Sequence, residues 1–81
     1  RGALPNDIRE CVLQAPEGMP IASALKESGL ASSNAEGMRL IKRGAVRLDG
    51  ERVEDRGLVL LKGVNVICQV GKRKFARLII E

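Results

Sequence analysis

Three basic side chains occur in the middle of the chain at the spacing i, i+3 and i+4: Arg39, Lys42 and Arg43. In an α-helix this spacing places all three on one side. Ser33 and Glu36, just before them, have the spacing of a capping box, in which each side chain accepts a hydrogen bond from a backbone N–H of the first turn. Gly44 suits the left-handed position after a helix end. Because a positive surface on rigid backbone suits phosphate groups, we interpret this segment as an RNA-binding surface.

Two predicted hairpins carry further cations. Asp49 and Gly50 are typical of a two-residue turn, and that register places Arg47 opposite Arg52. The two arginines repel each other unless an anion lies between them; alternatively, both side chains extend into water. The second hairpin has a tip in which Gly71 precedes three consecutive cations, Lys72, Arg73 and Lys74. Charge is ordinary at an exposed tip, but a phosphate backbone would relieve the repulsion among three cations, so we expect phosphate contact there.

The charge is unevenly distributed along the chain. The net charge is +4 over 81 residues, yet residues 39–81 alone hold eleven basic side chains against five acidic ones, a difference of +6. Such asymmetry favours a polyanionic partner, because neutralising phosphates releases condensed counterions. The alternative is a basic face that is merely solvated.

The residue types argue against catalysis by this chain. It has no histidine and no tyrosine, so it lacks a Ser-His or Cys-His pair and a tyrosine general acid. The two cysteines, Cys11 and Cys68, have no CxxC spacing, and we expect neither a zinc site nor any cofactor in this domain. The sequence does not decide whether they form a disulfide, although buried free thiols in a reducing cytosol are favoured. We therefore expect a non-catalytic, cytoplasmic domain.

The length indicates one small domain, without room for a catalytic and a binding domain together. No apolar run approaches the ~20 residues of a membrane span, and the first residues do not form a signal peptide. The chain begins at Arg1 rather than at a methionine, which favours a piece of a longer polypeptide.

Periodicity and turn residues predict the order of the elements. In chain order we expect a linker at Arg1–Asp7, a short strand or ragged helical turn at Ile8–Leu13, a loop at Ala15–Met19, helices at Pro20–Ser28 and about Asn34–Arg43, a hairpin at Ala45–Val53, and strands at 64–70 and Phe75–Ile80. These elements predict an α+β fold, with two short helices packed on one side of a small, mainly antiparallel sheet.

Several positions carry more detailed expectations. Pro20 suits the first turn of the first helix, and Gly29 suits its end, with Leu30 folding back in a Schellman motif. The apolar side of the second helix is predicted from Ala35, Met38, Leu40 and Ile41. Gly37 either permits close helix contact or is a tolerated flaw that costs about 1 kcal/mol relative to alanine.

The composition also limits how nucleic acid could be bound. Phe75 is the only aromatic residue and is expected in the core, so recognition by stacking bases on aromatic side chains is disfavoured. Phosphate, sugar and shape contacts to a structured RNA remain, with limited base reading by Ser33, Asn34 or Arg39. A DNA-binding helix-turn-helix is the competing hypothesis, but the strands and the basic hairpin that follow the helices argue against it.

Two stretches of the chain carry a resemblance to a known family. Residues 29–55 read GLASSNAEGMRLIKRGAVRLDGERVED and resemble the RNA-binding module named after ribosomal small-subunit protein S-four. The lead-in MPIASALKESGLASS and the ending VGKRKFARLIIE are most similar to the C-terminal domain of bacterial tyrosyl-tRNA synthetases. The resemblance covers residues 19–81, which leaves residues 1–18 as a linker and possible edge strand.

The resemblance implies a function. Such a domain binds tyrosine tRNA around its variable arm and anticodon stem, while an absent portion, a homodimer in this family, uses ATP and tyrosine to aminoacylate it. The family's RNA-facing positions match Ser33, Asn34, Arg39, Lys42 and Arg43, and Lys72, Arg73 and Lys74 are expected to add phosphate contacts. Positions that serve the fold match Leu40, Ile41, Val46 and Gly50.

Three departures from the family pattern qualify that carry-over. Many relatives have a basic residue at Asn34 and arginine at Met38, and the loss of these two cations implies weaker contact at the helix start or a shift of contact toward the hairpin tip. Many also have alanine at Gly37, which implies a less stable second helix here. The alternatives are the RNA-binding module of a pseudouridine synthase or of a ribosome-associated heat-shock protein, and a protein-interaction domain whose basic tip binds an acidic partner. We expect the isolated domain to be monomeric.

Overall fold

The computed structural model describes residues 8–81, so the linker predicted at Arg1–Asp7 lies outside the described residues. The elements in chain order are β1 (Arg9–Leu13), β2 (Met19–Pro20), α1 (Ile21–Glu27), α2 (Asn34–Lys42), β3 (Val46–Leu48), β4 (Glu51–Arg52), β5 (Val59–Leu60), β6 (Asn65–Val70) and β7 (Lys74–Ile80). Within this described part, neither helix is long and apolar enough to cross a membrane.

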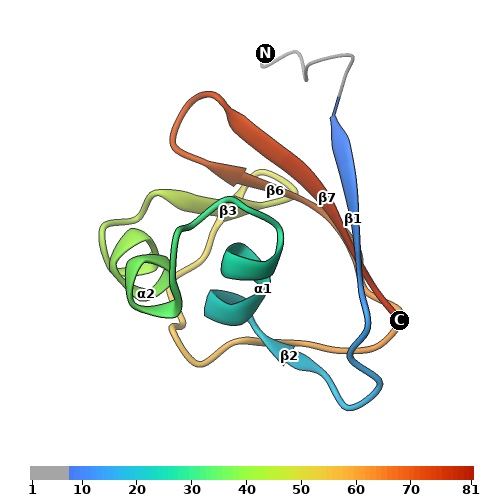
Figure 1. The fold of residues 1–81 in the computed structure, drawn as a ribbon. Helices are drawn as coiled ribbons and strands as arrows, with labels where there is room; N and C mark the ends of the chain where they lie inside the picture. The colour runs from blue at the N-terminus through green and yellow to red at the C-terminus, as the bar shows by residue number, and fades with distance from the viewer. Residues whose placement is uncertain (1–7) are drawn as a thin grey trace.

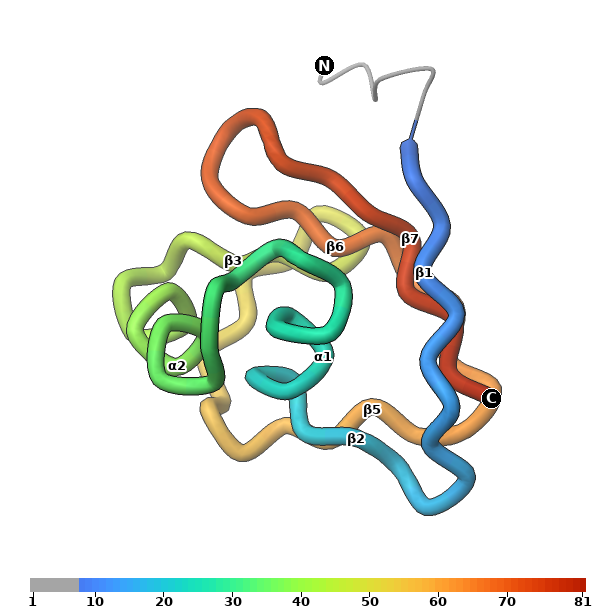
Figure 2. Tube along the Cα trace, viewed as in Figure 1, coloured from blue at the N-terminus to red at the C-terminus, as the bar shows by residue number. Residues whose placement is uncertain are grey.

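Five strands form one sheet in the order β1-β7-β6-β3-β4, and both helices lie on one of its faces (Figure 1). All neighbours pair antiparallel except β1 and β7, which are parallel. The α+β prediction is confirmed, and β1 is a strand at the sheet edge. Figure 2 shows how β1, near the start of the described chain, runs beside β7 at its end.

A second, two-stranded sheet pairs β2 with β5, and it was not predicted from the sequence. The loop predicted at Ala15–Met19 is therefore wrong at its last residue, because Met19 belongs to a strand. Pro20 is the N-cap of α1 rather than part of its first turn. Proline has no side-chain acceptor for the free N–H groups at a helix start. The small sheet compensates in part, because the Ile21 N–H donates to the Leu58 carbonyl at 2.9 Å.

The core lies between the helices and the sheet. Alternate residues of β6 and β7 point at the helices, and those of β7 are Ala76, Leu78 and Ile80, all at most 1 % exposed. Ile21 and Leu25 of α1 and Ile41 of α2 pack against them. Phe75 was expected in the core, but this is wrong: it falls on the other face of β7 and is half-buried, because the inward positions alternate with it.

Both helices end as predicted, with a glycine in the left-handed region. After α1, Gly29 has φ +82°, and the Leu30 N–H donates to the Leu25 carbonyl at 2.9 Å. This is the 6→1 bond of a Schellman motif. After α2, Gly44 takes the same role with φ +76°. These glycines let the chain turn sharply from each helix into the next element.

The start of α2 is capped, although not by a complete capping box. The Ser33 side chain accepts a hydrogen bond from the Glu36 N–H at 3.1 Å, as predicted. The Glu36 carboxylate, however, accepts from the Ser32 hydroxyl at 2.6 Å instead of from the Ser33 backbone. The reciprocal half of the predicted box is therefore wrong.

The buried side of α2 differs from the predicted apolar side. Ala35 and Met38 are exposed, whereas Gly37 and Ile41 are buried and Leu40 is half-buried. A Cβ added at Gly37 would lie 3.1 Å from the Ala22 carbonyl oxygen of α1. Glycine therefore permits the close contact between the two helices, and this approach rotates α2 away from the side that its larger apolar residues suggested.

The β3–β4 hairpin has the predicted register, with Arg47 opposite Arg52. Asp49 and Gly50 both have positive φ, +50° and +88°, as a type I′ turn requires. Each arginine has its own acceptor: Arg47 donates to the Gly50 carbonyl at 3.1 Å, and Arg52 forms an ion pair with Glu54 at 3.2 Å. These contacts lessen the repulsion without an anion between the two side chains.

Substitution of Gly37 tests the close helix contact. We expect Gly37→Val to lower the free energy of unfolding by about 1–3 kcal/mol, because the added atoms meet the backbone of Ala22. The matched control is Ala35→Val on the exposed side of the same helix, which should cost no more than about 0.7 kcal/mol of helix propensity. Urea unfolding of both variants measures the difference, and equal losses would contradict the close contact.

Candidate nucleic-acid interface

The hairpin tip between β6 and β7 is joined to the end of α2 by backbone hydrogen bonds. The Ala45 N–H donates to the Leu40 carbonyl of α2 at 3.0 Å, and the Ala45 carbonyl accepts from the Gly71 N–H at 2.9 Å. One residue therefore connects the last turn of α2 to the first residue of the tip. This connection brings two basic segments, which are about thirty residues apart in the sequence, to the same end of the sheet.

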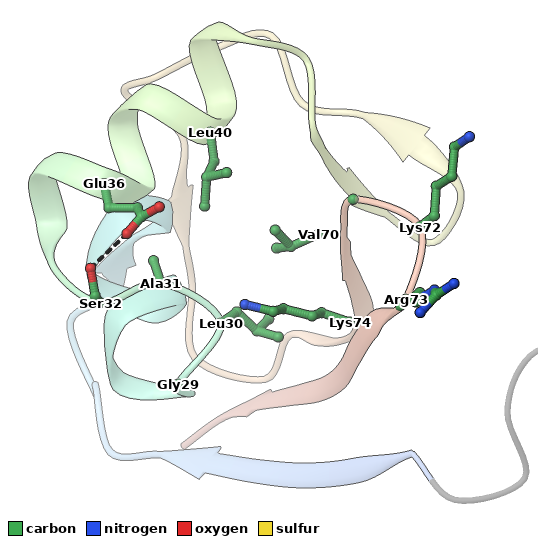
Figure 3. Close-up of a pocket in the computed structure, with 11 residues that line it drawn as sticks. Gly29, Leu30, Ala31, Ser32, Glu36, Leu40, Val70, Lys72, Arg73 and Lys74 are labelled. Atoms are coloured by element: carbon green, nitrogen blue, oxygen red, sulfur yellow. Dashed lines mark hydrogen bonds between the residues drawn. The ribbon is translucent and has the colours of Figure 1, made fainter.

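A pocket of about 560 Å³ lies between these two segments, and we call it the α2–tip pocket. Its walls come from the loop after α1, from α2 and from the tip (Figure 3). The lining residues are Gly29, Leu30, Ala31, Ser32, Glu36, Leu40, Val70, Gly71, Lys72, Arg73 and Lys74. The floor is apolar and the polar groups lie around it.

The three cations predicted at the tip do not all point the same way. Lys74 is the first residue of β7 and pairs with Val70, so strand alternation places it on the helix-covered face with Ala76. In Figure 3 its side chain extends into the pocket, whereas those of Lys72 and Arg73 point away from it. The tip thus presents one cation inward and two at the rim.

Glu36 gives the α2–tip pocket a negative charge. The hydrogen bond from Ser32 lowers the pKa of the Glu36 carboxyl below its ordinary value, against a smaller opposing effect of burial. The positive charges of Arg39 and Lys74 also lower this pKa, by less than the hydrogen bond does. Lys74 lines the pocket, whereas Arg39 does not. The tip therefore supplies the cations of this pocket, and α2 supplies its acid.

Lys42, the last residue of α2, and its C-cap Arg43 line a second hollow of about 430 Å³, which we call the α2–β4 hollow. It is lined by Ile41, Lys42, Arg43, Gly44, Arg52, Val53, Glu54 and Arg56. Four cations thus surround one acid, Glu54, which is already paired with Arg52. A hollow with this excess of positive charge suits a phosphate group.

The remaining predicted site residues do not line either hollow, and one of them caps α2. Asn34 is exposed in the first turn of α2, and Ser33 is half-buried with its oxygen engaged as the cap. Arg47 is exposed and lines neither hollow. Six of the predicted site residues thus line a hollow, Lys72, Arg73 and Lys74 at the first and Lys42, Arg43 and Arg52 at the second. The other four line neither: Ser33, Asn34, Arg39 and Arg47.

Both cysteines are free thiols, and burial raises the pKa of Cys68 to about 12, so this thiol stays protonated at neutral pH. Between residues 8 and 81, no group of three or more His, Cys, Asp or Glu side chains is placed to hold a metal ion. What the surface does offer is charge and a pocket, which is suited to binding.

Two features of this surface were missed from the sequence. Arg56 was not selected from the sequence as a site residue, although it lines the α2–β4 hollow. Glu36 was interpreted only as a capping residue, although its carboxylate faces the α2–tip pocket. Arg56 belongs to the basic second half of the chain, which is a weak signal, whereas nothing in the spacing of Glu36 indicated a pocket.

The chain belongs to the S4 domain family, whose model matches residues 19–66. That stretch contains both helices, strands β2 to β5 and the start of β6. The S4 domain is the RNA-binding module that the sequence motif resembles, so the family supports RNA binding by this chain.

Individual proteins that are similar to this chain match more of it than the family model does. The chain is 51% identical over 82 residues to a tyrosine–tRNA ligase of Aromatoleum aromaticum, covering all of this chain and 21% of that protein. It is 52% identical over 81 residues to a tyrosine–tRNA ligase of Nitrosospira multiformis, covering 99% of this chain and 20% of that protein. A tyrosine–tRNA ligase of Shewanella oneidensis is 47% identical over 77 residues. The chain thus spans about a fifth of the length of these relatives.

Two serine variants separate the charge of Glu36 from the capping of α2. Ser32→Ala should raise the pKa of the Glu36 carboxyl toward its ordinary value, since the Ser32 hydrogen bond is the main cause of the lowered pKa. Ser33→Ala should instead lower the free energy of unfolding by about 1 kcal/mol through loss of the cap, with a smaller change in that pKa. NMR titration of the Glu36 side-chain carboxyl carbon and urea unfolding measure the two effects.

The sign of the pH dependence follows from the lowered pKa. Because the folded pKa lies below the unfolded value of about 4.3, ionised Glu36 stabilises the fold above that pH, and this contribution is lost as the pH falls through the folded pKa. Ser32→Ala should therefore flatten this part of the stability profile. An unchanged titration in Ser32→Ala would show that the hydroxyl does not hold the carboxylate.

Proposed function

We propose that this chain is the non-catalytic tRNA-binding domain of a tyrosine–tRNA ligase. Its basic surface would hold tyrosine tRNA in the region of the variable arm and anticodon stem, so that a catalytic portion outside this chain can aminoacylate it. The observation that carries the proposal is the meeting of α2 and the basic tip at one pocket, in a chain whose relatives are named as tyrosine–tRNA ligases.

The binding would act mainly through phosphates. Arg39, Lys42 and Arg43 are exposed, as are Lys72, Arg73 and Lys74, so each is available to neutralise a phosphate. Residues of α2 line both hollows, and Arg52 and Arg56 extend the positive surface beyond the end of this helix. A rigid surface with cations at several points suits a folded RNA better than a flexible single strand, which would need aromatic side chains for stacking.

The proposal assigns the reaction to the absent portion. ATP and tyrosine would bind there, and this domain would need no cofactor. We further propose that the isolated domain is a monomer, that the whole enzyme is a cytoplasmic homodimer, and that Ser33 and Asn34 lie close enough to the RNA for limited base contact. Two relatives of the wider family, pseudouridine synthases and heat-shock proteins, remain as alternatives, as does an acidic protein partner.

A comparison of tRNAs tests the proposed partner. We expect tyrosine tRNA with its variable arm intact to bind more tightly than the same tRNA with the arm trimmed, because phosphate contacts are lost with the arm. Filter binding or fluorescence anisotropy at one fixed salt concentration measures the two affinities, with a short-armed tRNA as the control. Equal binding of all three RNAs would reject tyrosine tRNA as the specific partner.

Charge-removing variants test the proposed surface. Arg39→Ala and Lys42→Ala should each reduce the slope of log K against log salt by about 1, the effect of one lost phosphate contact. The matched control is Lys62→Ala, which removes an exposed cation in the turn beside Ile80, at the end of β7 opposite the tip. Thermal melting confirms that each variant folds.

The three slopes decide the question together. Reduced slopes for the α2 variants and an unchanged slope for Lys62→Ala support the surface around α2. Three equal reductions would indicate that net charge alone governs binding, and unchanged slopes in both α2 variants would exclude that surface.

A further inference from the structure

The α2–tip pocket contains an acid where a surface for phosphates would be expected to hold only cations. Glu36 lines it from α2 and Lys74 extends into it from β7 (Figure 3). Both side chains belong to the lining of this one pocket, yet they do not pair, since the one ion pair within residues 8–81 is Arg52–Glu54. The pocket therefore offers a separate acceptor and donor to a ligand.

The floor between these charges is apolar. Leu30, Leu40 and Val70 point into the pocket, and Ala31 lies beside them. A phosphate would be repelled by the carboxylate, and the apolar floor has no hydrogen-bond donor for it. A flat group with an apolar face and N–H donors on its edge would satisfy both features, and in RNA that group is an unpaired base.

We propose that the α2–tip pocket takes a single unpaired guanine of the bound RNA, a proposal that rests on the RNA-binding function above. The Watson–Crick edge of guanine carries two adjacent N–H donors, at N1 and N2, and an acceptor at O6. Glu36 accepts from the two donors, and the Lys74 ammonium donates to O6. The base face lies on Leu30, Leu40 and Val70.

The other bases fit this pair of charges less well. Adenine presents one amino group beside the N1 acceptor, which faces the carboxylate unfavourably. Cytosine has a single amino donor beside an acceptor, and uracil has one N–H between two carbonyls. A bidentate pair between a side chain and the correct base edge discriminates by roughly tenfold or more against a wrong base.

The dimensions and the rim agree with this ligand. The pocket volume of about 560 Å³ lies within the range of about 300–1,000 Å³ usual for small-molecule sites. Lys72 and Arg73 stand at its rim and point outward, where they can contact the phosphates on either side of an extruded nucleotide. Base and backbone would thus be bound by different residues of the same tip.

Bulged RNA duplexes test the proposal with residues 1–81 as the protein. Four duplexes of one sequence carry a single bulged guanosine, inosine or adenosine, or no bulge. We expect the guanosine duplex to bind about tenfold more tightly than the adenosine duplex. Inosine should be intermediate, because it lacks only the N2 amino group. Fluorescence anisotropy at one salt concentration measures all four.

A pair of isosteric variants assigns the preference to the pocket. Glu36→Gln should reduce the guanosine-to-adenosine ratio to near one, while the duplex without a bulge binds equally well or slightly more tightly because a negative charge is lost. The control is Glu54→Gln, which removes the acid of the α2–β4 hollow and should leave the ratio unchanged. Lys74→Gln should lower the ratio as well, with a weaker affinity for every duplex.

The outcomes separate this inference from the proposed function. Equal affinity for guanosine and adenosine bulges, with the duplexes and tyrosine tRNA still bound, overturns the guanine pocket and leaves the RNA-binding function standing. A preference that persists in Glu36→Gln also overturns it, because the carboxylate would then not read the base. Failure to bind any of these RNAs would instead overturn the proposed function, and the pocket proposal with it.

Discussion

The position of the basic tip depends on the backbone of Ala45. Its N–H closes the last turn of α2 on Leu40, and its carbonyl accepts from Gly71 at the start of the tip. Gly44 and Gly71 both have positive φ, +76° and +67°, so the chain can turn on either side of this connection. Because main-chain groups make both bonds, the arrangement of helix and tip does not depend on the charged side chains, which remain available for binding.

Strand alternation then decides what each cation of the tip can do. Lys74 belongs to β7 and shares the helix-covered face with Ala76 and Leu78, so its side chain enters the α2–tip pocket at the end of the core. Lys72 and Arg73 lie in the turn, where no pairing fixes them to that face. A change in register by one residue would exchange these roles, because side chains alternate with a period of two.

Much of this fold could be predicted from local patterns. The ends of both helices, the Asp49-Gly50 turn and the long strands follow from glycine positions and alternation, which act over a few residues. The errors arise from contacts between distant segments. Met19 joins a strand only because it meets Leu60, and Ala35 and Met38 stay exposed because Gly37 packs against Ala22. Phe75 shows the same limit, since its apolar type suggested the core while Ala76 occupied the inward position.

The sequence predicted which cations belong to the candidate interface, but it did not predict the pockets that they line. Helix spacing alone places Arg39 beside Glu36, at i and i+3, but only the fold brings Lys74 to the same pocket as Glu36. The α2–tip pocket combines residues 29–40 with residues 70–74, which lie far apart in the chain. The α2–β4 hollow combines residues 41–44 with 52–56, which meet only because the β3–β4 hairpin folds back. No spacing in the sequence encodes either combination. This explains why Arg56 and the second role of Glu36 were missed while the tip and the helix were not.

The capping arrangement explains how Glu36 can serve recognition without endangering the helix. In a complete capping box its carboxylate would be held by the Ser33 backbone. Here Ser33 caps α2 through its own side chain, and Ser32 holds the carboxylate at the pocket wall. The hydrogen bond favours the ionised form, and an ionised acceptor with one oxygen oriented by Ser32 retains capacity for further donors. Folding and recognition thus depend on neighbouring serines, so a change in one need not abolish the other.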